Sequence, residues 1–418
     1  MHGFSAIKSF LLAFAFYYPL IMSMLWMSGS LLYYFRRERK RPPRTQPHPL
    51  PGYPPLSVIV PCHNEGRQVR ETILQLKKLK WPEFEIIAIN DGSTDDTGEL
   101  LEALLEEVPQ LRVLHFSSNQ GKATGLRMGA LAARHEYLIC IDGDALLDEY
   151  AGHWMMPHFL ASPRVGAVTG NPRIRNRSTL LGKLQVGEFS SIIGLIKRAQ
   201  RTYGRIFTVS GVITAFRKRA LQDAGYWHTD MVTEDIDISW QLQLRHWDIR
   251  YEPNALCWLL TPETLRGLWR QRLRWAQGGC EVMLRYAKQL PKWRMRRMWG
   301  VPIEYLLSVL WAYCMLAIIV LWILGKFVPL PPGLQVPTMI PHWHGVILGL
   351  TCLLQFLISL VIDRRYETRI GRNYYWMIWY PVAYWLINTF TTVVAVPKAL
   401  LRKRKQRVVW VSPDRGNR

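Results

Sequence analysis

The sequence predicts an α/β domain with a mainly parallel sheet, held between membrane-spanning helices. Between residues 56 and 142, short apolar segments alternate with longer segments of helical periodicity, a pattern that is typical of βαβ units and parallel sheets. Hydrophobic residues make up 49% of the 418 residues, and many of them lie in long segments without charge. A segment of about 20 apolar residues is long enough to cross the ~30 Å hydrocarbon core of a bilayer.

Four segments are candidates for membrane spans, because none of them contains Asp, Glu, Lys or Arg: residues 10–35, 305–325, 344–362 and 374–396. The first is too long for the apolar core of a typical signal peptide and has no small-residue cleavage site, so we expect a membrane anchor. The last contains Pro381, which could divide it into a re-entrant hairpin instead of a span.

The basic residues predict the orientation of the chain in the membrane. Residues 36–44 are rich in arginine and lysine, whereas only Lys8 precedes the first span. By the positive-inside rule, the N-terminus lies outside and residues 37–299 form a cytoplasmic domain. Residues 1–36 are then the N-terminal span, 300–400 a C-terminal membrane region and 401–418 a basic tail. Four simple spans would put that tail outside, although its charge favours the cytoplasm, so its side stays open.

The formal charge of +22 does not indicate a nucleic-acid-binding protein. The basic clusters, residues 36–44, 285–297 and 402–407, lie beside the spans, where they suit the anionic headgroups of a lipid bilayer. No nucleic-acid recognition motif accompanies them. The six cysteines have no paired spacing, which argues against a zinc site or a disulfide framework.

The elements of the predicted sheet follow one another in regular order. Four strands are expected at residues 56–61, 85–90, 112–116 and 137–142, with helices at 66–80, 97–108 and 122–133 between them. Ligands on such sheets bind beyond the carboxyl ends of the strands. That edge is therefore where chemistry is expected.

Acidic residues follow three of these strands. Glu65 follows the first strand, Asp91 the second, and Asp142-Gly143-Asp144 the fourth. Each alone could be a tight turn or a helix cap, but three at one sheet edge point to a bound ligand. Mg²⁺ or Mn²⁺ prefers carboxylate and phosphate oxygens, so Asp142 and Asp144 are candidate ligands of a metal that neutralises a diphosphate.

Two further residues could contact a nucleotide at this edge. Asp91 can accept hydrogen bonds from a base or a ribose. Lys122 begins a predicted helix and can supply positive charge near a nucleotide. A solvated lysine in a first helical turn explains Lys122 equally well.

Two motifs occur later in the chain. Thr233-Glu234-Asp235 begins a predicted amphipathic helix, and Gln271-Arg272-Leu273-Arg274-Trp275 lies within another helix. The positions i, i+3 and i+4 put Gln271, Arg274 and Trp275 on one helix face. Taken alone, the acids could be residues favoured by a helix dipole, and Trp275 could be a membrane-interface residue.

Together these motifs resemble the family 2 inverting glycosyltransferases, and Gln271-x-x-Arg274-Trp275 matches the signature of their processive branch. The resemblance extends over residues 17–416 to the bacterial poly-β-1,6-N-acetylglucosamine synthases. It is carried by residues 140–148, 168–175, 190–198, 233–240, 271–279 and 410–416. It implies a GT-A fold, which is a Rossmann-like and mainly parallel sheet, in a multi-pass protein of the bacterial inner membrane.

The resemblance also implies roles for individual residues. UDP-N-acetylglucosamine would be the donor, bound by Glu65, Asp91, Lys122 and Asp142, with Mg²⁺ or Mn²⁺ held by Asp142 and Asp144. Asp235 would be the general base. Trp275 would hold the acceptor terminus, and Gln271 and Arg274 the diphosphate and the acceptor region. The product would be a polysaccharide of the biofilm matrix, exported as it grows.

The resemblance implies regulation by partners as well. The chain has four spans at most, which is one fewer at the N-terminus than the resemblance implies. These spans leave few helices to surround a polymer. We therefore expect a small two-span membrane subunit. The resemblance also implies regulation by cyclic diguanylate. Because no cytoplasmic segment looks like an added nucleotide-sensing domain, we expect this regulator to act on the complex.

Three other functions remain compatible with parts of the sequence. A non-processive polyprenyl-phosphate glycosyltransferase shares the early acidic motifs but does not need Gln271-x-x-Arg274-Trp275. A cellulose, chitin or hyaluronan type of synthase shares all of the motifs and differs in its sugar or linkage. A non-enzymatic membrane protein with a degenerate transferase domain is disfavoured by the intact Asp91, Asp142, Asp144 and Asp235.

Overall fold

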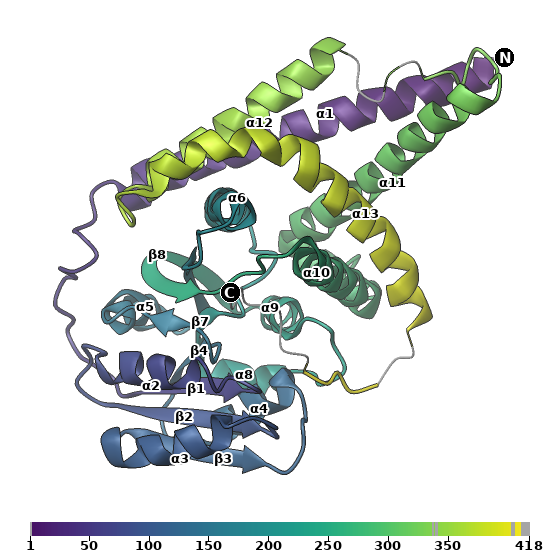
Figure 1. Cartoon of the computed structure of the whole chain (residues 1–418). Coiled ribbons are helices and arrows are strands. Elements are labelled where there is room, and N and C mark those ends of the chain that lie inside the picture. Colours follow the sequence, from purple (N-terminus) through teal and green to yellow (C-terminus); the bar gives the residue numbers. More distant parts are fainter. Residues whose placement is uncertain (1, 337, 339–341, 403–405, 411–418) are drawn as a thin grey trace.

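The computed structural model describes residues 2–336, 338, 342–402 and 406–410. Figure 1 shows a sheet domain in the lower half of the molecule and long helices that extend away from it above. A middle layer of helices separates the two parts (Figure 1).

Parallel strands form the first half of the sheet, as the sequence predicts. Their order is β3-β2-β1-β4, and every neighbouring pair among them is parallel. The elements are β1 (Leu56–Cys62), α2 (Val69–Lys77), β2 (Phe84–Asp91), α3 (Thr97–Glu107), β3 (Leu111–Phe116), α4 (Lys122–Ala132) and β4 (Tyr137–Ile141). Each lies within a few residues of its predicted position.

Antiparallel pairing extends the sheet to eight strands, in the order β3-β2-β1-β4-β7-β6-β8-β5. Here β7 pairs antiparallel with both β4 and β6, whereas β6 and β8 are parallel. The added elements are β5 (Leu146–Leu147), α5 (Ala151–Leu160), β6 (Val165–Ile174), β7 (Ile213–Arg217), α8 (Lys218–Ala224), α9 (Glu234–Leu244) and β8 (Asp248–Leu259).

Both faces of the sheet are buried, which explains why its strands are apolar throughout. Val58 and Val60 pack into a cluster with α2, α3 and α5. Ile59, between them, points to the opposite face and packs with α4, α8 and α9, because successive side chains of a strand alternate between its faces.

Helix α9 differs from its prediction. It was expected to be amphipathic, but ten of its eleven residues are buried, so this prediction was wrong. Ile238 and Leu242 face the sheet, whereas Trp240 and Leu244 pack against α10 (Leu265–Tyr286). A helix enclosed on both sides in this way cannot keep a polar face towards water.

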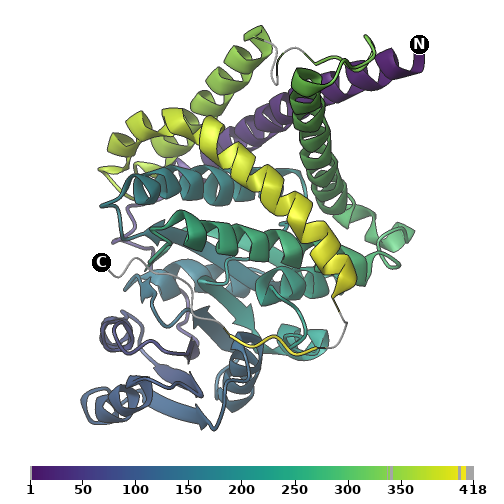
Figure 2. The same ribbon diagram turned by 45° about the vertical axis from the view of Figure 1, so that its right-hand side comes forward.

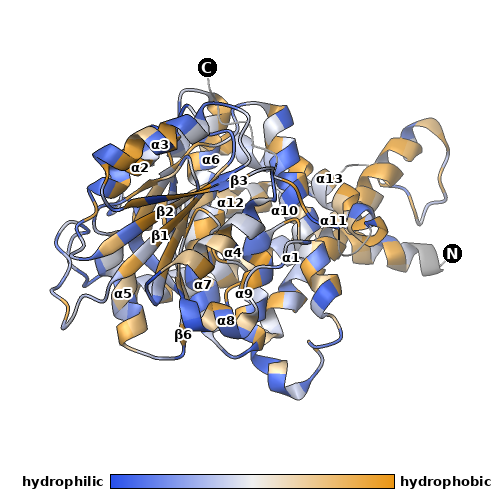
Figure 3. Ribbon diagram, turned by 90° about the horizontal axis from the view of Figure 1, so that it is seen from below, coloured by the Kyte–Doolittle hydropathy of each residue, from blue (hydrophilic) through white to orange (hydrophobic). Residues whose placement is uncertain are grey.

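Four helices in the described part of the chain are long and apolar enough to cross a membrane: residues 5–38, 300–327, 343–363 and 384–401. They belong to α1 (His2–Tyr33) with its π-helical end (Tyr34–Glu38), α11 (Gly300–Phe327), α12 (His342–Asp363) and α13 (Tyr380–Leu401). Figure 3 shows that apolar residues predominate on the helices that project from the sheet domain.

The predicted apolar segment 374–396 changes structure just before Pro381. It begins in a 3₁₀ helix (Ile370–Trp379) and continues in α13. Pro381 lies in the first turn of α13, where its missing N–H costs nothing. The hydroxyl of Tyr380 donates to Glu188 on α6 (Leu180–Glu188) at 3.4 Å. Past the other end of α13, Arg402 pairs with Glu281 on α10 at 2.7 Å. Figure 2 shows this yellow helix descending beside α10 towards the sheet domain.

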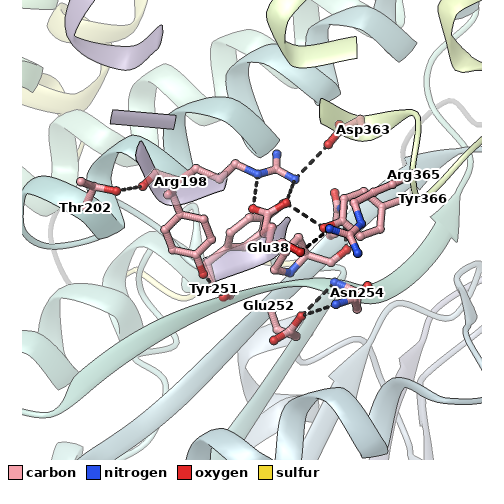
Figure 4. A network of polar contacts seen from close by, with 12 residues as sticks. Glu38, Arg198, Thr202, Tyr251, Glu252, Asn254, Asp363, Arg365 and Tyr366 are labelled. Atoms are coloured by element: carbon pink, nitrogen blue, oxygen red, sulfur yellow. Dashed lines mark hydrogen bonds and ion pairs between the residues drawn. The ribbon is translucent and has the colours of Figure 1, made fainter. Parts of the chain in front are cut away.

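A buried network of polar contacts fastens α1 and α12 to the sheet domain (Figure 4). Arg198, on α7 (Ile196–Tyr203), is fully buried and bonds Glu38 at 2.6 and 3.2 Å and Asp363 at 3.0 Å. Tyr366 donates to Glu38 at 2.7 Å, and Arg365 bonds the Glu38 carbonyl. The ends of two long helices thus share one guanidinium with the domain below.

Candidate active site

A cavity of about 430 Å³ lies where the sheet domain meets the long helices. Seven of the residues predicted from the sequence to form the site line it: Lys122, Asp142, Asp144, Asp235, Gln271, Arg274 and Trp275. They come from α4, the loop after β4, α9 and α10. The fold therefore gathers motifs that are up to about 150 residues apart in sequence around one space.

The loop Asp142-Gly143-Asp144 is packed closely onto the end of β1. A Cβ on Gly143 would lie 3.1 Å from the Cys62 sulfur and from Cγ of Glu65, so a larger residue would push the loop away. Glu65 is fully buried beneath this glycine and does not line the cavity. Its side chain supports the acidic loop from below.

Lys122 is enclosed by acidic residues. Its Nζ lies 2.5 Å from Asp142 and 3.0 Å from Glu234, and its side chain is 15% exposed. Burial lowers the pKa of this lysine, but the carboxylates of Asp142 and Glu234 outweigh that effect and raise it well above its ordinary value. The alternative of a solvated first-turn lysine is wrong, and Lys122 stays charged in the site.

The two acids of the loop suit a divalent cation. Burial, together with the charge of Asp142, raises the pKa of Asp144 to about 7, so this pair gains from a cation that offsets its repulsion. In the described part of the chain, no group of three or more His, Cys, Asp and Glu side chains could hold a metal ion. Mg²⁺ commonly binds through one or two carboxylates and takes its other ligands from phosphates and water, so the pair fits a metal brought with a nucleotide diphosphate.

Asp235 has an unusual environment for a carboxylate at the start of a helix. Burial raises its pKa to about 6, and the neighbouring Glu234 adds to this, while Lys122 and Arg274 lower it. A helix start by itself favours the charged form of an acid, but burial has the larger effect on the pKa of Asp235. A carboxylate with this pKa is ionised near neutral pH and basic enough to remove a proton.

On α10, the predicted spacing brings three side chains together. Gln271, Arg274 and Trp275 all face the cavity, as the i, i+3, i+4 pattern requires. Arg272 points elsewhere: it is buried and pairs with Glu188 at 2.6 Å, and its guanidinium lies 4.3 Å from the centre of the Trp275 ring. Arg272 thereby holds the tryptophan in position.

Asp91 lies at the same sheet edge but outside the cavity. It is fully buried, and its two carboxylate oxygens accept hydrogen bonds from the backbone N–H groups of Gln120 at 2.6 Å and Gly121 at 2.8 Å. In this arrangement Asp91 holds the loop before α4, and that loop in turn directs Lys122 into the cavity.

Sequence reasoning missed a second group of residues beside Asp91. His63 Nδ1 lies 2.8 Å from the Asp91 carbonyl, and Asn119 makes two hydrogen bonds with the backbone of Trp410, at 2.8 and 3.1 Å. The rings of Trp410 and His63 are 6.2 Å apart. Gly121, at φ +87°, has no room for a Cβ because the Val408 carbonyl lies against it. The C-terminal segment 406–410 therefore covers the loop that Asp91 holds.

Lys197 was also missed. It is buried, lines the cavity and bonds Thr169 at 3.3 Å. Burial lowers its pKa to about 7, although Asp235 opposes the shift. The available signal was the sequence itself, since Lys197 follows a run of apolar and small residues from Phe189 to Ile196.

Comparison with known families and proteins agrees with this geometry. Residues 54–278 match the family model described as "Glycosyltransferase like family 2". The chain is 40% identical over 408 residues to a poly-beta-1,6-N-acetyl-D-glucosamine synthase of Staphylococcus epidermidis, covering 97% of this chain and 98% of that protein. A Staphylococcus aureus protein of the same name is 41% identical with the same coverage.

Among solved structures, the mannosyltransferase PcManGT from Pyrobaculum calidifontis, in complex with GDP-Man and Mn²⁺, aligns with a TM-score of 0.55. The alignment covers 95% of this chain and 99% of that protein at 19% identity. At this identity the likeness establishes a shared fold and nothing about substrates.

Proposed function

Because the chain belongs to glycosyltransferase family 2, we propose that it polymerises N-acetylglucosamine from UDP-N-acetylglucosamine into a β-1,6-linked exopolysaccharide and passes the polymer into the membrane. One observation carries this proposal. The cavity that holds Asp142, Asp144 and Asp235 is also lined by Tyr18 and Trp26 of α1 and by Tyr305 and Ser308 of α11, so the catalytic groups open directly onto two membrane helices.

The donor would lie along the sheet edge. Its uracil would sit in the region of His63, Asn119 and Trp410, which Asp91 organises through the loop 119–121, while Glu65 supports the acidic loop that meets the diphosphate. Asp142 and Asp144 would hold Mg²⁺ or Mn²⁺, which neutralises the diphosphate as it leaves. Lys122 and Arg274 add fixed positive charge on the same side.

Asp235 would act as the general base. It removes the proton from the acceptor hydroxyl while the hydroxyl oxygen attacks the anomeric carbon and the bond to UDP breaks. A single in-line displacement inverts an α-linked donor into a β-linked product and needs one base. The ionised form of Asp235 is favoured by Lys122 and Arg274, so these residues keep the base ready at neutral pH.

The acceptor end of the polymer would be held on α10. The indole of Trp275 offers a flat surface for a sugar ring, and Gln271 can bond its hydroxyl groups. Beyond them, Tyr18, Trp26 and Tyr305 supply aromatic and polar groups at the level of the membrane helices. This arrangement favours a polymer over a single lipid-linked sugar, because a product can advance without leaving the protein.

We propose that the domain of residues 37–299 and the tail of residues 401–418 both lie on the cytoplasmic side of the inner membrane. The segment 406–410 packs on the sheet domain, with Val408 bonded to Thr229 at 3.0 Å, and both ends of α13 contact helices of that domain. On this topology α1, α11 and α12 cross the membrane and α13 does not. The predicted fourth span is then not a span. With three crossing helices the basic tail lies on the cytoplasmic side, which its charge favours.

The predicted partners remain part of the proposal. Three crossing helices cannot enclose a hydrated polymer, since exposed polar groups in lipid cost several kcal/mol each. A small two-span subunit would complete the passage, and cyclic diguanylate would act on the complex and not on this chain alone.

The test is synthesis from a panel of UDP-sugars by the purified chain in vesicles, with mass analysis of the products. Polymers of N-acetylglucosamine are expected, and only from UDP-N-acetylglucosamine. A polymer of another sugar would reassign the enzyme to another β-glycan synthase, and a single sugar on a polyprenyl phosphate would make it non-processive. Synthesis and export that respond to cyclic diguanylate without any partner would remove the need for the subunit.

A further inference from the structure

A second, larger space lies on the other side of the wall that bounds the catalytic cavity. It is a groove of about 970 Å³ between α1, α7 and the beginning of α11. Trp26, Gln200 and Glu304 line both spaces, so they form the wall between them. None of the proposed catalytic or donor-binding residues lines this groove.

One side of the groove is apolar and belongs to the membrane helices. Met22 and Leu25 contribute from α1, and Ile303 and Leu307 from α11. Leu25 and Ile303 are 45% and 53% exposed, which is expected for side chains that face lipid and not a protein core.

The other side is strongly basic. Five arginines line it, from segments far apart in the sequence: Arg164, Arg201, Arg205, Arg296 and Arg297. Among the described residues that line the groove, only Asp248 and Glu304 are acidic. Asp248 already pairs with Arg201 at 3.0 Å, Arg205 at 3.2 Å and Arg250 at 3.3 Å, so the groove keeps an excess of positive charge.

The behaviour of Arg205 reflects this excess. Burial lowers its pKa, and the nearby guanidinium groups of Arg201, Arg297 and Arg164 lower it further, while Asp248 opposes them. Arginines held close together in this way gain from an anion that several of them can share.

We propose that this groove binds an anionic phospholipid, with its phosphate among the arginines and its acyl chains along α1 and α11. A free phosphate compound would use the basic side but leave the apolar side bare. Arg296 and Arg297 lie in the 3₁₀ helix Trp293–Met298, directly before α11, at the depth where phospholipid headgroups meet the end of a membrane helix. Guanidinium groups bind phosphate oxygens in pairs, which suits arginine better than lysine for this contact.

A lipid in this position would cover the outer side of the wall formed by Trp26, Gln200 and Glu304. If the polymer passes between α1 and α11, as the proposed function requires, the lipid would seal that side of its passage. The binding itself does not depend on the proposed function and can be measured without any enzymatic activity.

The test is native mass spectrometry of the full-length protein in detergent, titrated with phosphatidylglycerol or with phosphatidylcholine of the same chains. We expect about tenfold tighter binding of phosphatidylglycerol. The double variant Arg296→Gln with Arg297→Gln should lose this preference. The matched control, Lys292→Gln with Arg294→Gln, removes the same charge from the same segment outside the groove and should keep it.

A second pair of variants tests the apolar side. Ile303→Trp fills the groove and should weaken phosphatidylglycerol binding about tenfold, whereas Ile323→Trp, at a 43% exposed position of the same helix outside the groove, should not. Glycerol 1-phosphate should not displace the lipid, because it lacks the acyl chains. Circular dichroism and unfolding midpoints establish that the variants compared are folded.

The proposal is overturned by any of three results. Equal binding of the two lipids would remove the role of the arginines. Equal losses in the test and control variants would make the effect one of general surface charge. Displacement by glycerol 1-phosphate would assign the groove to a soluble phosphate compound.

Discussion

Replacement of Lys122 by methionine should move the pH dependence of turnover. Lys122 lowers the pKa of Asp235, and the structure bounds the strength of this effect. Both charged groups lie close to Gly211. The point that a Cβ on this glycine would occupy is 3.3 Å from Asp235 Oδ2 and 3.4 Å from Lys122 Nζ, so the carboxylate and the ammonium group are at most about 7 Å apart. At an effective dielectric constant of about 20, that separation corresponds to roughly 2 kcal/mol, or about 1.5 pKa units.

The sign follows from the role of Asp235 as a base. Its pKa of about 6 predicts that kcat falls as pH drops through about 6, because the base becomes protonated. Without Lys122 the pKa rises, and the midpoint of this fall should move to about pH 7.5. At pH 7 the loss from protonation alone is then about fourfold, and it should disappear at pH 9.

The assay is UDP release at saturating UDP-N-acetylglucosamine between pH 5 and pH 9. Saturation separates the position of the midpoint from any loss of donor affinity, since Lys122 also faces Asp142. Lys122→Arg keeps the charge and should keep the midpoint near pH 6. Lys183→Met, on α6 and outside the cavity, is the control for removing a lysine charge. A midpoint unchanged in Lys122→Met would refute the assignment of Asp235 as the base.

Four further predictions test the site and the fold. Asp235→Asn should abolish polymer synthesis but leave UDP binding within a few-fold, and near-normal turnover would mean another base. Excess EDTA should stop synthesis and added Mn²⁺ should restore it, since Asp142 and Asp144 suit a divalent cation; full activity in EDTA would contradict this. Trp410→Ala should raise the KM for the donor about tenfold, which is the size of one base–aromatic stacking contact. An unchanged KM would mean that the uracil ring of the donor binds elsewhere. Arg198→Met should destabilise the fold by about 3–5 kcal/mol, because it leaves Glu38 without its buried partner. The control is Arg70→Met, which breaks the exposed pair of Arg70 with Glu107. Equal thermal stability of the two variants would refute this prediction.

Much of the fold could be predicted from the sequence because its signals are local. The first four strands and the three helices between them were predicted from periodicity within a few residues, and the four apolar helices were recognised from segments without charge. The acids after the strands could be placed at one edge without coordinates, because the carboxyl ends of parallel strands meet there. Likewise, the facing of Gln271, Arg274 and Trp275 follows from the helical repeat alone.

Other features depend on contacts between distant segments, which periodicity does not encode. The antiparallel pairing of β7 with β4 and β6 joins segments tens of residues apart. The burial of α9 depends on the placement of α10, and the position of α13 depends on contacts of its two ends with α6 and α10. An apolar helix of 22 residues reads as a span in sequence whether lipid or protein covers it.

The electrostatics of the site were decided only by the tertiary structure. The local sequence allowed two equally good interpretations of Lys122 and put Asp235 at a helix start, where the helix dipole favours the ionised form. In the fold, burial raises the pKa of Asp235 to about 6 against that effect, and the carboxylates of Asp142 and Glu234 decide between the two interpretations of Lys122. The residue types that chemistry requires can be recognised along the chain, but their charge states depend on desolvation and on neighbours that only the folded chain brings within a few ångströms.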